Sequence, residues 1–138
     1  MSSVIFLVIA IVAVGILALI AMTLGGKRGH SFDIEEYQTR WLKIENSLDR
    51  DDPRSFSMAI IDADKLLDRA LNELGLPGKT MGERMKRIDS RFDKPNAVWG
   101  AHKLRNQIAH ESGFEVEYSQ ASHALAAFKQ ALKDLGAI

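Results

Sequence analysis

The chain has 138 residues, and its 18 lysines and arginines balance its 18 aspartates and glutamates, so its formal net charge at pH 7 is zero. This length predicts a single domain, and the balanced charge excludes a strongly basic protein that coats nucleic acid through its overall charge. The sequence has no cysteine, which excludes disulfides and zinc or iron–sulfur sites with cysteine ligands.

The first predicted element is an apolar helix at the N-terminus. Residues Val4 to Leu24 form a run of 21 residues without a charged side chain. A helix of that length spans about 30 Å, which is the thickness of the hydrocarbon core of a bilayer. A cleavable signal peptide is the alternative, but its apolar stretch is usually only about 7–15 residues long and follows positive charges. We therefore predict a retained transmembrane helix over residues 1–24.

The residues after this helix predict its orientation. Lys27 and Arg28 follow the apolar run directly, whereas only the α-amino group precedes it. The positive-inside rule therefore places the rest of the chain in the cytoplasm. Residues 25–31 predict a short flexible tether to the membrane. The expected protein is single-pass, with residues 32–138 as a cytoplasmic domain at the lipid bilayer.

Helical periodicity runs through residues 32–138, without the sustained alternation that predicts strands. A first helix is expected after Asp33, which can cap its N-terminus. The second begins at the N-cap Asp52 with Pro53 in its first turn, and it ends near Gly75. Its wide apolar face predicts that it is the central core helix.

Three further helices complete the expected domain. Thr80 begins a short helix by the capping-box pattern, and Pro95 begins a longer helix that is expected to reach about Ser112. Four apolar residues at helical spacing predict a last helix, namely Leu125, Phe128, Leu132 and Leu135. The predicted fold class is therefore all-α: a single transmembrane helix followed by a compact bundle of four or five helices.

The helix that begins at Pro95 carries a row of polar side chains. His102, Asn106 and His110 recur every four residues, so they are expected in one row. Arg105 lies at the border of the apolar face, where its aliphatic stem can pack while its guanidinium faces outwards. The stripe expected to be buried, on the side opposite the polar row, consists of Ala97, Val98, Ala101, Leu104 and Ile108, and Trp41 and Trp99 are also expected in the core.

The stretch "AHKLRNQIAHE", residues 101–111, resembles the signature of HEPN domains. That signature is an arginine, then four to six residues of which the first is polar, and then a histidine. The upstream stretch "AIIDADKLLDRALNELGLPGKTMGERMK", residues 59–86, also resembles the second helix, turn and third helix that are common in the family. The resemblance covers roughly residues 35–135.

The resemblance implies an all-α domain that commonly forms a homodimer, with two copies of the motif in one cleft. Many such domains are metal-independent ribonucleases, and others are noncatalytic modules that bind nucleotides or protein partners. Carried over to this chain, the resemblance assigns acid–base chemistry to His110, stabilisation of phosphate charge to Arg105 and a supporting role to Asn106. It implies neither a metal nor another cofactor.

These residue types suit RNA cleavage without a metal. A histidine titrates near neutral pH and can move the protons of the ribose 2′-hydroxyl and the leaving 5′-oxygen, while an arginine stays charged and can hold phosphate oxygens. Arg105 and His110 lie about 140° apart on an ideal helix, so a shared target needs a distorted helix end or a second copy of the chain. A solvated polar helix face is the alternative interpretation of the motif.

Two supporting residues and a basic surface complete the predicted site. Asp64 lies at the border of the central helix's apolar face and is expected to pair with Arg105, while His102 is expected as a surface neighbour of the motif. Residues 79–105 carry eight basic and three acidic side chains, which predicts a local surface for RNA or for anionic lipid. The candidates for nucleic-acid binding are Lys79, Arg84, Lys86, Arg87 and Lys103.

The sequence therefore supports two main functional hypotheses. The first is a membrane-anchored, HEPN-like endoribonuclease that acts at a dimer cleft and is controlled by a regulatory protein partner or by oligomerisation. The second is a noncatalytic HEPN-like module that binds a nucleotide or a protein partner at the membrane. A tethered bundle that serves only as a scaffold is a third hypothesis.

Overall fold

The structure is a computed structural model that describes residues 2–25 and 30–138, and the regular elements in those residues are all helices. The all-α prediction is therefore confirmed. The chain divides into two units, residues 1–31 and residues 32–138. Most of the tether predicted over residues 25–31, including Lys27 and Arg28, lies outside the described residues.

Helix α1 (Ser2–Gly25) forms the first unit. Its segment Ser2–Met22 is long and apolar enough to cross a membrane, a property that signal sequences near an N-terminus share, and none of it is buried in the structure. The large apolar side chains between Val4 and Met22 are 45–77% exposed. Helix α1 is thus a candidate membrane span.

The second unit contains five α-helices and a short 3-10 helix. In chain order these elements are α2 (Ile34–Ser47), α3 (Pro53–Glu73), α4 (Met81–Ile88), the 3-10 helix η1 (Asp89–Arg91), α5 (Pro95–His110) and α6 (Tyr118–Leu135). The N-caps predicted at Asp33, Asp52 and Thr80 are confirmed, because each side chain accepts a hydrogen bond from a backbone N–H two or three residues later. Helix α5 ends two residues before the predicted position, because the backbone of Glu111 is extended.

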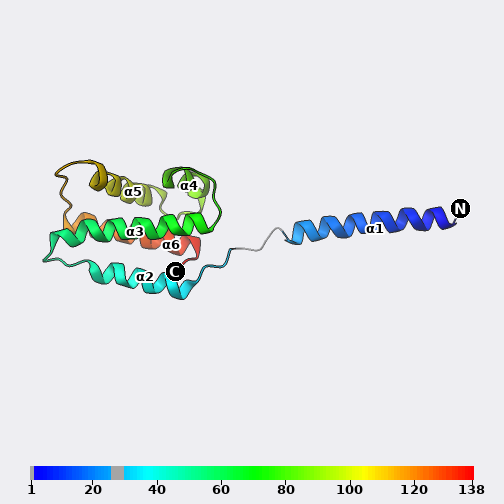
Figure 1. Cartoon of the computed structure of the whole chain (residues 1–138), viewed down its shortest axis with the longest axis horizontal. Helices are drawn as coiled ribbons and strands as arrows, with labels where there is room; N and C mark the ends of the chain where they lie inside the picture. Colours follow the sequence, from blue (N-terminus) through cyan, green and yellow to red (C-terminus); the bar gives the residue numbers. More distant parts are fainter. Residues whose placement is uncertain (1, 26–29) are drawn as a thin grey trace. The chain divides into compact units, whose positions relative to one another are not determined.

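Helix α3 is the centre of the second unit. It packs against α2, α4, α5 and α6, and Figure 1 shows α2 on one side of it and α5 with α4 on the other. The largest completely buried side chains come from several helices and are Tyr37, Phe128, Ile60, Leu67, Leu71, Met85, Leu132 and Val98. All buried apolar residues of the described chain lie within residues 32–138, so this unit contains its own core.

Ion pairs fix α2 to its neighbours in the second unit. Both Nη atoms of Arg69 on α3 donate to the carboxylate of Glu36, at 2.8 and 3.0 Å. These hydrogen bonds hold the pKa of Glu36 below its ordinary value. Lys129 on α6 similarly pairs with Glu45 on α2, with its Nζ 2.7 Å from Oε1. These two ion pairs join α2 to α3 and to α6.

Candidate functional site

A basic groove lies between α3, α4 and α5. Its volume is about 900 Å³, and its lining residues come from α3, the loop before α4, α4 and α5. Six cationic side chains and three carboxylates belong to this lining, namely Lys65, Lys79, Arg84, Lys86, Lys103 and Arg105 with Asp64, Asp68 and Glu83. The groove therefore has an excess of positive charge, which favours an anionic ligand.

A second hollow, of about 790 Å³, lies between α2 and α3, but its charges are balanced. Four cationic and four acidic side chains line it. Two of the cations, Arg40 and Arg69, are already paired with Glu36. The positive excess is thus a property of the basic groove and not of this hollow.

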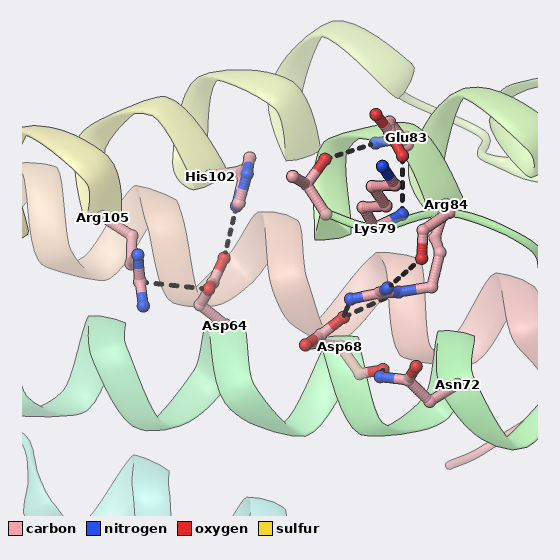
Figure 2. Close-up of polar contacts among 10 residues, drawn as sticks. Asp64, Asp68, Asn72, Lys79, Glu83, Arg84, His102 and Arg105 are labelled. Atoms are coloured by element: carbon pink, nitrogen blue, oxygen red, sulfur yellow. Dashed lines mark hydrogen bonds and ion pairs between the residues drawn. The ribbon is translucent and has the colours of Figure 1, made fainter.

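The carboxylate of Asp64 organises one wall of the basic groove. Asp64 is 3% exposed on α3, and Figure 2 shows His102 and Arg105 of α5 both directed towards it. Its Oδ1 lies 2.7 Å from His102 Nδ1, and its Oδ2 lies 3.3 Å from Arg105 Nε. The Asp64–Arg105 pair predicted from the sequence is therefore present, as an ion pair whose Nε is not aligned for a hydrogen bond.

His102 does not lie where the sequence placed it. The predicted surface row would leave this side chain exposed, but it is only 12% exposed and faces Asp64. Ala97, which was expected in the buried stripe, is exposed, whereas Val98 and Ala101 are buried. The face of α5 that contacts the bundle is therefore rotated towards His102, because the buried carboxylate of Asp64 needs polar partners that an alanine cannot supply.

Asn106 contacts both Arg105 and His102, which lie on the same helix. Its Oδ1 accepts a hydrogen bond from Arg105 Nη1 at 3.1 Å, and its Nδ2 lies 3.5 Å from His102 Nε2. We call Asp64, His102, Arg105 and Asn106 the Asp64 cluster. The supporting position predicted for Asn106 agrees with these contacts, although its role in a reaction stays a prediction.

His110 lies apart from the Asp64 cluster. It is the last residue of α5, it is exposed, and it does not belong to the lining of the basic groove. Within one chain the structure therefore brings Arg105 together with His102 and not with His110. The separation of about 140° between Arg105 and His110 on an ideal helix accounts for this arrangement.

The lysines predicted to bind nucleic acid lie around the basic groove. Lys79, Lys86 and Lys103 are exposed and line it, whereas Arg87 is exposed but does not. Across residues 2–25 and 30–138, no ion pair engages the ammonium groups of these three lysines. Lys65 is an exposed member of the lining that was not predicted, and its position directly after Asp64 was the available signal.

Arg84 has a different place from the one predicted. It is 9% exposed, so it is a buried arginine of the groove lining and not an exposed side chain. Its Nη2 and Nε lie 2.7 and 3.2 Å from Asp68 Oδ1 (Figure 2). Its Nη1 donates to the carbonyl oxygen of Gly78 at 2.9 Å. Arg84 therefore fastens α4 and the loop before it onto α3, because its burial requires these partners.

We expect Arg84→Ala to lower the free energy of unfolding of residues 32–138 by about 1–3 kcal/mol, because it removes the partner of Asp68 and frees the loop at Gly78. Lys86→Ala, two residues later on α4 and exposed, should change it by less than about 0.5 kcal/mol. Urea unfolding followed by circular dichroism measures both. Equal unfolding midpoints for the two variants would contradict the structural role of Arg84.

Trp99 forms an aromatic part of the groove. The core position predicted for it is wrong in part, because the ring is partly exposed at the groove while Trp41 is buried. Its Nε1 donates to Asp89 Oδ1 at 2.8 Å, which fixes the ring. A Cβ added at Gly82 of α4 would lie 3.7 Å from the ring, at ordinary van der Waals distance. The partly exposed indole is therefore a fixed aromatic surface in the groove lining.

No family model, no curated protein and no solved structure matches the chain. Among the residues that the structure describes, no three histidine, aspartate or glutamate side chains are grouped so that they could hold a metal ion. The chemistry of the site therefore has to be inferred from the basic groove and the Asp64 cluster themselves.

Proposed function

We propose that the protein is a membrane-anchored, HEPN-like module that binds the phosphates of RNA or of a nucleotide in the basic groove. This proposal rests on a contrast between two arginines that are ion-paired within the fold and three lysines that are not so paired in the described part of the chain. Arg84 and Arg105 neutralise Asp68 and Asp64 inside the fold. Lys79, Lys86 and Lys103 line the groove, and their ammonium groups form no ion pair with a carboxylate in the described residues. Phosphate groups are the natural counter-ions for such lysines.

The size and the lining of the basic groove suit this ligand. Its volume of about 900 Å³ lies within the range of about 300–1,000 Å³ that is usual for small-molecule and cofactor sites. The ring of Trp99 offers a surface on which a base can stack, as aromatic side chains do in proteins that bind single strands. A nucleotide, or a short segment of single-stranded RNA, can thus use both the charge and the ring.

The anchor in this proposal is α1. Its exposed apolar surface supports insertion into a bilayer, and the charges of Lys27 and Arg28 in the sequence favour a single-pass topology with residues 32–138 in the cytoplasm. This location would restrict binding to ligands near the inner face of the membrane.

The test is RNA binding by the full chain in detergent micelles, measured by the fluorescence anisotropy of a labelled single-stranded RNA. We expect the triple variant with Lys79, Lys86 and Lys103 each replaced by glutamine to bind about 10- to 100-fold more weakly. The slope of log K against log salt should also become shallower, by about 0.7 for each phosphate group that the variant no longer neutralises.

The matched control removes the same charge elsewhere, with glutamine at Lys43, Lys94 and Lys133, which are exposed and lie outside the basic groove. We expect it to bind RNA nearly as the unmodified chain does. An equal loss of affinity in both triple variants would show attraction by total charge alone. Absence of RNA and nucleotide binding in the unmodified chain would refute the proposal.

A second candidate function is metal-independent RNA cleavage by Arg105, Asn106 and His110 at a homodimer cleft. The exposed position of His110 at the end of α5 favours it, because a second copy of the chain can reach this side chain. It requires dimerisation and cleavage that depends on His110. A regulatory protein partner would then control when the two copies meet.

A further inference from the structure

We infer that His102, oriented by Asp64, is the general base of the basic groove and acts on the ribose 2′-hydroxyl of RNA bound there. The inference rests on the proposed function, since it needs RNA in the groove. It assigns the chemistry to a histidine within one chain, where the second candidate function needs His110 and a second copy. The substrate class is a phosphodiester with a neighbouring hydroxyl group.

The Asp64–His102 contact selects one tautomer of the neutral imidazole. Asp64 is nearly buried, and its Oδ1 lies 2.7 Å from His102 Nδ1. A carboxylate can only accept a hydrogen bond, so the proton of a neutral His102 is held on Nδ1. Nε2 then carries the lone pair, as in the aspartate–histidine pairs that serve nucleophilic enzymes. The ring is therefore oriented as a base before any ligand arrives.

The imidazole of His102 is 12% exposed and lies in the wall of the basic groove. Among the described residues its Nε2 has one polar neighbour, Asn106 Nδ2 at 3.5 Å. That distance is long for a hydrogen bond, and the Asn106 side chain is also held by Arg105 through Oδ1. A ligand hydroxyl can thus take the better hydrogen bond to Nε2.

Two other histidines of the helical unit lack this arrangement. His110 and His123 are both exposed, and no carboxylate in the part of the chain that the structure describes forms an ion pair with either ring. His123 lies in a separate hollow, between α5 and α6. The combination of an orienting carboxylate, partial burial and a cationic groove therefore distinguishes His102 from both.

The proposed cleavage step needs no reactant other than RNA and water. His102 Nε2 takes the proton of the 2′-hydroxyl, and the oxygen forms a bond to the adjacent phosphorus while the bond from phosphorus to the 5′-oxygen breaks. The 5′-oxygen takes a proton from water, and the proton on His102 neutralises the hydroxide that remains. The products are a 2′,3′-cyclic phosphate and a 5′-hydroxyl. Lys103, which follows His102 on α5 and lines the groove, is placed to stabilise the charge on the phosphoryl oxygens.

The experiment uses the full chain in detergent micelles with EDTA and a labelled single-stranded RNA. We expect cleavage, and we expect His102→Ala to slow it about 100- to 10,000-fold while RNA binding by anisotropy is retained. Added imidazole should restore part of the rate in this variant, because it can replace the missing base, whereas a defect in packing could not be repaired in this way. His123→Ala is the matched control and should cleave at the unmodified rate.

Asp64→Asn is the second variant and protects the test if His102→Ala does not fold. It keeps the size of the side chain but removes the charge that holds the proton on Nδ1, so kcat should fall while KM changes little. RNA that is bound but not cleaved by the unmodified chain would overturn this inference and leave the proposed function intact. Cleavage that His110→Ala abolishes and that survives both His102→Ala and Asp64→Asn would overturn it in favour of the dimer cleft. Absence of RNA binding would refute the proposed function itself.

Discussion

Asp64→Ala is expected to lower the free energy of unfolding of residues 32–138 by about 2–4 kcal/mol. The substitution leaves the guanidinium of Arg105 and the Nδ1–H of His102 without the carboxylate that both contact. Loss of one partner from a completely buried pair costs about 3–5 kcal/mol. The lower range applies here because the Arg105 side chain is 29% exposed and can recover part of its hydration.

Urea unfolding of residues 32–138 measures this effect, since that unit contains its own core. Asp62→Ala is the matched control, because Asp62 is a more accessible aspartate on the same helix and is not among its buried residues, and it should cost less than about 0.5 kcal/mol. A double-mutant cycle with Arg105→Ala should show a positive coupling between the two sites. Equal costs for Asp62→Ala and Asp64→Ala would contradict a stabilising role for the Asp64 cluster.

Leu67→Ala is expected to destabilise the same unit by about 3–4 kcal/mol, because it opens a cavity in the centre of the bundle. Leu67 has no exposed surface, and it lies on α3, the helix that packs against α2, α4, α5 and α6. The neighbouring helices can collapse into such a cavity only in part, so the packing around the missing side chain is not replaced.

Leu42→Ala removes the same atoms from a leucine that is 55% exposed on α2. It should cost less than about 1 kcal/mol, since little apolar surface leaves a buried site. Both variants should keep the dependence of the free energy on urea concentration, because that slope follows the surface exposed on unfolding. Similar costs for the two leucines would mean that α3 is not the centre of the core.

The N-termini of α2, α3 and α4 were predictable because they depend on neighbours along the chain. Asp33, Asp52 and Thr80 each cap the backbone two or three residues ahead, so the sequence contains both partners of each interaction. The Asp64–Arg105 pair was predictable for a related reason, since both residues border the apolar faces of their helices.

The rotation of α5 and the burial of Arg84 were not predictable in this way. Ideal helical geometry fixes which residues share a face, but it does not fix which face meets Asp64. His102 is turned inwards by a partner 38 residues earlier, and Arg84 by Asp68 and the carbonyl of Gly78, which only the turn before α4 brings close. These tertiary contacts determine which histidine and which cationic side chains line the basic groove. The residues of the site could therefore be identified only from the structure.

The apolar surface of α1 has a consequence for the association of two chains. If α1 lies in a bilayer, diffusion is confined to two dimensions, and neighbouring copies meet at an effective concentration that can reach the millimolar range. A contact between two helical units that buries less than the roughly 1,000 Å² needed by freely diffusing partners would then be sufficient for pairing. Association of the domains would depend on the surface density of the protein in its membrane, and a change in expression could act as a switch.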